Sequence, residues 1–106
     1  MADKPWKVWE REGSKDLGGT RSGPLGLNTP DCMDCPLVAP EFKYYKHFVW
    51  YEADWKQAEL NAANHCPDKF PILAIKEAGR NGRKRVQMNW EDFVLLHKLA
   101  TQAEIW

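Results

Sequence analysis

The hydrophobic and polar positions along the chain switch between helical and strand-like periodicity. Apolar residues three or four positions apart predict helices at residues 5–17, 48–64 and 90–104. Apolar runs and alternation predict strands at residues 37–45, 70–75 and 84–88, with two shorter candidates at residues 20–22 and 31–34. This order of elements predicts an α/β domain in which helices flank a central mixed β-sheet.

Glycine, proline and asparagine mark the breaks between these elements. Gly18-Gly19 ends the first predicted helix. Residues 18–30 have the Gly, Pro, Ser, Thr and Asn content of a loop, which we expect to be mobile until a ligand binds. Residues 79–82 predict a hairpin turn, and Asn89 is the expected N-cap of the last helix.

The predicted strand at residues 37–45 carries a charged pair on one face. Alternate side chains of a strand point to opposite faces, so Glu41 and Lys43 share a face. Because Pro40 cannot donate a ladder hydrogen bond, we expect the strand to be bulged or locally unpaired there. The following helix has its own polar stripe, formed by Asp54, Gln57 and Asn61.

Asp31 adds a second carboxylate to this pair. It begins the predicted neighbouring strand, which would bring its carboxylate beside that of Glu41. Two converging carboxylates suit Mg²⁺, which polarises a phosphodiester and lowers the pKa of a bound water. Lys43 beside such a metal would position or deprotonate the attacking water, or stabilise charge in the transition state. The alternative is a Glu-x-Lys pair on a solvated strand face.

Taken in order, these residues resemble the PD-(D/E)XK nuclease superfamily. The resemblance is greatest to small phage and archaeal-type Holliday junction resolvases and related phage endonucleases. The matching segments are Pro30-Asp31, Glu41-x-Lys43, the helical Trp55-Lys56-Gln57-Ala58, the apolar residues 70–75 and the ending at residues 86–93. As in such phage proteins, a Gly- and Arg-bearing segment, residues 18–23, precedes the aspartate. The resemblance covers roughly residues 9–99.

The resemblance implies a single restriction-endonuclease-like domain over residues 1–106, acting as a metal-dependent endodeoxyribonuclease on branched DNA. It implies Mg²⁺, replaceable by Mn²⁺, and a homodimer, because two symmetrical cuts need two sites related by a two-fold axis. The implied catalytic residues are Asp31, Glu41, Lys43 and Gln57, and the implied metal ligands are Asp31, Glu41, the Phe42 carbonyl and Glu10, with Glu12 as the alternative to Glu10. The competing function is a non-catalytic nucleic-acid- or protein-binding module on the same fold.

Composition and charge narrow these possibilities. The chain has 106 residues, 43% of them hydrophobic, which suits one domain with one core. Fifteen basic and fifteen acidic residues give a net charge of zero, which argues against a polybasic nucleic-acid binder. DNA contact would then need a local basic patch, for which the candidates are Arg21, Lys46, Arg80, Arg83, Lys84 and Arg85. A solvated hairpin turn is the alternative for the last four.

The sequence has no apolar run of about 18 residues and no apolar signal segment. We therefore expect no membrane association and a cytoplasmic location, in the host cytoplasm if the chain is phage-encoded. The three cysteines are then expected to be reduced thiols rather than a disulfide framework. A structural zinc site formed by Cys32, Cys35, His65 and Cys66 is the alternative.

Six tryptophans are unusual in a chain of this length. Trp55 and Trp90 occupy core-like helical positions, and Met33 and Met88 are also expected in the core. Trp6, Trp9 and Trp50 have no such assignment, and they would stack on unpaired bases at a branch point or form a dimer contact.

Overall fold

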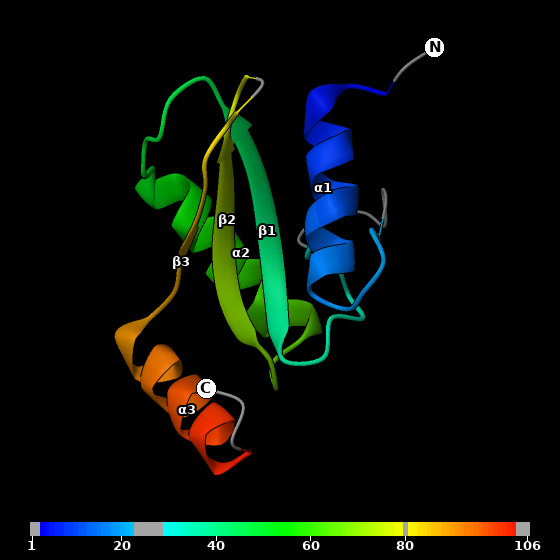
Figure 1. Ribbon diagram of the computed structural model, residues 1–106. Coiled ribbons are helices and arrows are strands. Elements are labelled where there is room, and N and C mark those ends of the chain that lie inside the picture. Colours follow the sequence, from blue (N-terminus) through cyan, green and yellow to red (C-terminus); the bar gives the residue numbers. More distant parts are fainter. Residues whose placement is uncertain (1–2, 23–28, 80, 104–106) are drawn as a thin grey trace.

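A mixed sheet with a helix on each face forms the body of the protein (Figure 1). The computed structural model describes residues 3–22, 29–79 and 81–103. Within these residues the elements are, in chain order, α1 (Pro5–Asp16), β1 (Val38–Tyr45), α2 (Glu52–His65), β2 (Phe70–Glu77), β3 (Lys84–Gln87) and α3 (Trp90–Gln102). The predicted α/β class and mixed sheet are confirmed.

The strand order is β1-β2-β3, so β1 is one edge of the described sheet. It runs parallel to β2, with α2 as the crossover, whereas β3 is antiparallel to β2. The strands predicted at residues 20–22 and 31–34 are wrong, because side chains there satisfy main-chain groups that a ladder would otherwise pair. Thr20 donates its amide to the Asp34 carboxylate (2.8 Å), and Met33 donates its amide to the Ser22 hydroxyl (2.9 Å).

Helix α1 ends where the glycine pair predicts. Gly18 has a φ of +80°, and the amide of Gly19 donates to the carbonyl of Ser14 at 2.8 Å. These are features of a Schellman C-cap, which requires a residue able to adopt the left-handed conformation. Within the helix, Gly13 allows a close approach to β1, because a Cβ there would collide with the Phe42 ring.

Side chains of the sheet form a hydrophobic cluster under each helix. On the α1 face, Trp9 meets Phe42 edge-on with ring centroids 5.3 Å apart, and its indole N–H donates to the Ala74 carbonyl at 3.3 Å. The cluster on the α2 face comprises Trp55, Ala58, Leu73 and Ile75. Trp55 is therefore a core residue, as predicted, and the buried position of Trp9 leaves it unable to stack on a base.

Helix α2 begins at Glu52 rather than at residue 48. Its N-cap, Tyr51, is extended, with φ −91° and ψ 127°. The run Val49-Trp50-Tyr51 explains the late start, because β-branched and aromatic residues favour extended backbone. Phe48 packs against the α2-face cluster from outside the helix.

Helix α3 lies beyond the end of β3, away from both faces of the sheet (Figure 1). Among its described residues none is buried, and Trp90 is 70% exposed. The predicted core position of Trp90 is wrong because no other layer covers this helix in the described structure. Met88 lines a surface pocket instead of the core, whereas Met33 packs beside the small cluster at the end of α2. None of the described helices is long and apolar enough to cross a membrane.

Candidate active site

Three polar side chains of β1 meet the polar stripe of α2. Glu41, Lys43 and Tyr45 alternate along β1 and therefore face α2 together. Hydrogen bonds join Asn61 Nδ2 to Glu41 Oε2 (3.1 Å), Lys43 Nζ to Gln57 Oε1 (3.1 Å) and Tyr45 Oη to Asp54 Oδ2 (2.5 Å). Both stripes are predictable from the sequence, and their pairing is the reason that α2 orients the Glu-x-Lys motif.

Asp31 docks against the outer edge of β1 as part of a loop. Its amide donates to the Pro40 carbonyl (3.1 Å), and its Oδ2 accepts the Phe42 amide (2.7 Å). Main-chain groups of Pro40 and Phe42 thus face away from β2, so proline removes no bond from the β1–β2 ladder. The register with β2 is continuous, and the predicted bulge at Pro40 is wrong. Asp31 lies beside β1, as predicted, although in a loop and not in a strand.

A pocket of about 400 Å³ opens where α1, the Asp31 loop and β1 meet. Its lining includes Trp6 and Glu10 from α1, Asp31 from the loop, and Glu41, Lys43 and Tyr45 from β1. The structure therefore brings together the two predicted carboxylates, the predicted lysine and the preferred third acidic residue. Phe42 and Tyr44 complete the lining.

Burial and mutual repulsion shape the charges of the two carboxylates. Burial, and then the charge of Glu41, raise the pKa of Asp31 from its ordinary value of 3.8 to about 7, against the lowering effect of the Phe42 amide. Burial also raises the pKa of Glu41, which is 4% exposed, although Lys43 and Asn61 oppose the rise. The carboxylates of the pocket therefore carry negative charge where burial limits their solvation by water.

Lys43 pairs with Glu41 on the same face of β1. Its Nζ lies 3.8 Å from Glu41 Oε1 and donates to Gln57, while the side chain stays partly exposed at the pocket. Gln57 itself is exposed at the helix surface and touches the site through Lys43. Gln57 thus holds the Lys43 ammonium group, and its catalytic role stays a prediction.

Of the two candidates for the third acidic residue of the site, the structure favours Glu10 over Glu12. Glu10 lines the pocket, and its charge contributes to the raised pKa of Asp31. Its Oε2 accepts a 2.8 Å bond from Arg21 Nε, which ties the loop after α1 to the pocket. Glu12 instead lies 3.7 Å from Lys76 Nζ and does not line the pocket.

The donor chemistry of the pocket fits a hard cation. Asp31 and Glu41 offer carboxylate groups whose pKa values are raised. Asn61, which bonds Glu41 but does not line the pocket, has a buried Oδ1 without a hydrogen-bond partner in the described structure. A divalent cation with its own waters would relieve this local excess of acceptors. Among the described residues, no three His, Cys, Asp or Glu side chains form a group that could hold a metal ion.

No family model, curated protein or solved structure matches the chain. The interpretation of this site therefore depends on its residues and their geometry.

The predicted DNA-contacting residues are spread over several places. The cations of Arg83 and Arg85 lie 5.3 Å and 4.3 Å from the Phe48 ring centroid, whereas Lys84 lies over Trp9, towards α1. Neighbouring side chains of β3 point to opposite faces, so the three do not form one patch. Lys46 is exposed directly after β1, and Arg80 lies outside the described residues.

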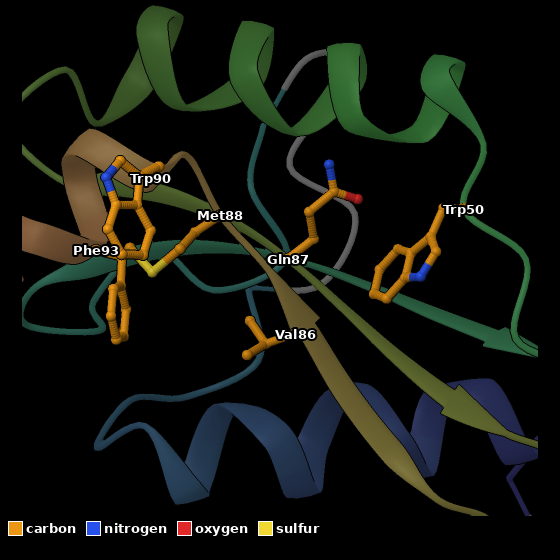
Figure 2. Close-up of a pocket in the computed structure, with 6 residues that line it drawn as sticks. All are labelled: Trp50, Val86, Gln87, Met88, Trp90 and Phe93. Carbon is orange, nitrogen blue, oxygen red and sulfur yellow. The ribbon is translucent and has the colours of Figure 1, made fainter.

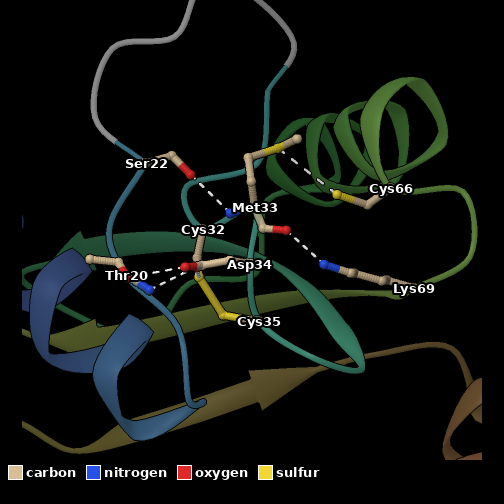
Figure 3. The surroundings of a disulfide bond; sticks show 8 residues. All are labelled: Thr20, Ser22, Cys32, Met33, Asp34, Cys35, Cys66 and Lys69. Carbon is tan, nitrogen blue, oxygen red and sulfur yellow. Dashed lines mark hydrogen bonds between the residues drawn. A yellow bond between two sulfur atoms is a disulfide. The ribbon is translucent and has the colours of Figure 1, made fainter.

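Cys32, the residue after Asp31, forms a disulfide with Cys35 (Figure 3). The expectation that all cysteines are reduced thiols is wrong here, because the loop folds back on itself and brings the two fully buried side chains together. Bonded sulfurs are not thiolates, so this pair does not supply the zinc site considered from sequence. Cys66 is a buried free thiol near Met33, with 3.9 Å between the two sulfurs.

Thiol titration tests this pairing. Because Cys66 is the free cysteine and Cys32 pairs with Cys35, we expect one reactive thiol per chain after denaturation without reductant. After reduction, all three cysteines of the sequence should react. Three reactive thiols in the unreduced, denatured protein would contradict the disulfide.

A second pocket, of about 690 Å³, lies between β3 and α3 and is separate from the candidate site. Figure 2 shows Gln87 and Val86 pointing to opposite sides of β3, with Met88, Trp90 and Phe93 gathered near the start of α3. Trp50, from the segment before α2, closes the other side of this pocket. Its lining is almost wholly apolar and offers none of the charged groups found beside β1.

Asn61 and Tyr45 are the site residues that sequence reasoning did not assign. Asn61 is 2% exposed and makes the direct hydrogen bond to Glu41. The sequence signal for Asn61 was its place on the polar stripe of α2. Tyr45 continues the spacing of Glu41 and Lys43 by a further two residues, and burial and its bond to Asp54 raise the pKa of its hydroxyl.

Removing the amide of Asn61 should destabilise the folded protein, because Glu41 is buried and bonds to that amide. We expect Asn61→Leu to lower the free energy of unfolding at pH 8 by about 1–3 kcal/mol, because an ionised, buried carboxylate loses a donor. Chemical denaturation followed by circular dichroism measures this loss. Asn64→Leu is the control, since Asn64 is exposed on the same helix. Equal effects of the two substitutions would contradict the assigned role of Asn61.

Proposed function

We propose that the protein is a metal-dependent endodeoxyribonuclease that hydrolyses phosphodiester bonds, with branched DNA of the Holliday-junction type as its substrate. The observation that carries this proposal is the convergence of Asp31, Glu41 and Lys43 on one pocket beside β1. The order of these residues along the chain resembles the PD-(D/E)XK pattern, which supports the same reaction. The restriction-endonuclease-like fold belongs to this proposal too.

Each residue has a distinct part in the proposed reaction. Asp31, Glu41 and the Phe42 carbonyl would hold Mg²⁺ or Mn²⁺, and the chemistry supplied by the bound ion is polarisation of the phosphodiester and a lower pKa for a coordinated water. Lys43, held by Gln57 and by the charge of Glu41, orients the attacking water and stabilises negative charge on the phosphoryl oxygens. Asn61 keeps Glu41 in place.

Basic side chains outside the pocket would contact the DNA backbone. Arg21 is held at the pocket by Glu10, and Lys46 is exposed directly after Tyr45, a residue of the pocket lining. Arg80, Arg83, Lys84 and Arg85 remain candidates along the hairpin. With no net charge to attract DNA from a distance, the protein should bind undistorted duplex modestly and in a salt-sensitive manner.

Cleavage assays separate the nuclease from a non-catalytic binding module. A synthetic four-way junction, a flap and a linear duplex of the same sequence are incubated with the purified protein and Mg²⁺, Mn²⁺ or EDTA. We expect metal-dependent cleavage that is fastest on the branched DNAs. Binding of all three DNAs without cleavage in either metal would favour the module and reject the nuclease.

Two further expectations accompany this proposal. Two chains would act together, since paired cuts require two sites related by symmetry. The exposed apolar side chains of α3, Trp90, Leu95 and Leu99, offer a surface for such an association. Sedimentation analysis over a range of concentrations tests it. The cytoplasmic location stays a prediction.

A further inference from the structure

Trp6 shares the candidate active-site pocket with the proposed metal ligands. It lies on the first turn of α1, four positions before Glu10, so both side chains occupy the same face of the helix and line the same pocket as Asp31. Trp9, the other tryptophan of α1, is buried against Phe42 and anchors the helix to the sheet. With Trp9 providing that anchor, Trp6 remains 42% exposed at the pocket.

A half-exposed indole beside a phosphate-cleaving site has a specific chemical use. The flat face of an aromatic side chain stacks well on a nucleobase, whatever the base. In a continuous duplex the base faces are covered by their neighbours, whereas an unpaired nucleotide can turn its base out of the stack. A pocket of about 400 Å³ is within the size range of small-ligand sites, so it can admit a group the size of a nucleotide.

We propose that Trp6 stacks on an unpaired base next to the scissile phosphate and so makes the enzyme select such positions, which occur at branch points. This inference rests on the proposed nuclease function and adds the feature of the DNA that the site recognises. Its basis is the placement of one exposed indole in the pocket that also holds Asp31, Glu41 and Lys43. Trp6 is therefore a specificity residue and not one that performs the hydrolysis.

Trp50 is a control for Trp6 that is matched in exposure. It is 44% exposed, almost the same as Trp6, but it lines the apolar pocket beside β3 (Figure 2). A general effect of removing a surface tryptophan would appear in both variants. An effect of stacking at the site would appear only at Trp6.

The experiment compares two DNAs of the same sequence, one fully paired and one with an unpaired base beside the cleavage position. We expect Trp6→Ala to slow cleavage of the second DNA roughly ten- to a hundredfold, as the strength of base–aromatic stacking implies. Cleavage of the paired DNA should change less than about twofold, and Trp6→Phe should keep most of the selectivity because it keeps an aromatic face. Trp50→Ala should keep the wild-type ratio of the two cleavage rates. A 2-aminopurine at the unpaired position gives a second readout, since its fluorescence should be quenched on binding by the wild type and not by Trp6→Ala.

The outcomes separate this inference from the function on which it rests. If the wild type cleaves neither these DNAs nor the four-way junction with Mg²⁺ or Mn²⁺, the nuclease proposal itself fails. Cleavage of the junction alone overturns only the recognition of an unpaired base. If the wild type cleaves both, but Trp6→Ala affects the two DNAs equally or leaves both unchanged, the role of Trp6 is overturned and the nuclease stands. Thermal unfolding of Trp6→Ala, Trp6→Phe and Trp50→Ala establishes that each variant is folded before its rates are compared.

Discussion

Replacing Lys43 by alanine is expected to abolish metal-dependent cleavage while leaving DNA binding largely intact. The ammonium group lies 3.8 Å from Glu41 and is oriented by Gln57 at the pocket where the phosphate would react. Loss of a positioned group that handles a proton or stabilises transition-state charge slows a reaction by at least about a hundredfold. Rates on a four-way junction, measured beside binding by electrophoretic mobility shift, check both parts of this prediction.

Glu41→Ala should give the same result for a different reason. Glu41 is one of the two carboxylates proposed to hold the metal, so its loss should remove cleavage and also the stabilisation that Mg²⁺ gives to the folded protein. Lys43→Ala should retain that stabilisation.

Lys56→Ala is the control for these two variants, because Lys56 is exposed on α2 and should have no effect on either rate or binding. Full activity of purified Lys43→Ala or Glu41→Ala would reject the assignment of the site.

Local signals in the sequence predicted much of this fold. Gly18-Gly19 marks the end of α1 because only a residue tolerant of positive φ suits that C-cap, and the helix does end there. The Glu-x-Lys face of β1 follows from strand alternation alone. The polar stripe on α2 follows from helical periodicity. The predicted start of that helix at residue 48 is wrong, because Phe48 packs against the core from outside the helix, which begins at Glu52.

Local sequence signals could not predict the features that depend on contacts between distant segments. The bond from Asn61 to Glu41 joins two elements whose relative placement no local pattern encodes. Trp90 sits at a core-like helical position, but whether a helix face is covered depends on the layer opposite it. The Cys32–Cys35 disulfide depends on how tightly the loop turns. Pro40 is tolerated because β1 is an edge strand, which a sequence cannot reveal.

Replacing Asp31 by asparagine is expected to stabilise the protein at pH 8 by about 2–4 kcal/mol. The pKa of Asp31 is raised to about 7 in the folded protein, against 3.8 for an ordinary aspartate. Each unit of such a difference corresponds to about 1.4 kcal/mol. Asparagine keeps an oxygen that can accept the Phe42 amide and carries no charge to bury. A functional carboxylate that lowers stability in this way is typical of active sites.

The sign of the pH dependence follows from the direction of this shift. Between about pH 4 and pH 7 the folded protein keeps a proton on Asp31 that the unfolded chain has lost, so the stability of the wild type falls as the pH rises through this window. The advantage of Asp31→Asn should therefore be full above pH 7 and vanish near pH 4. Urea denaturation of both proteins at several pH values measures the difference.

Asp34→Asn provides a control of opposite sign. Hydrogen bonds from Thr20 lower the pKa of Asp34, so its neutral replacement should destabilise the protein at pH 8.

Mg²⁺ adds a test that needs no DNA. The ion should raise the melting temperature of the wild type at pH 8 and have a much smaller effect on Asp31→Asn, because a ligand stabilises only the folded state that binds it. If Asp31→Asn is less stable than the wild type at pH 8, the burial of an ionised Asp31 is contradicted. If it is more stable but responds to Mg²⁺ as the wild type does, Asp31 is a strained carboxylate that does not bind the metal.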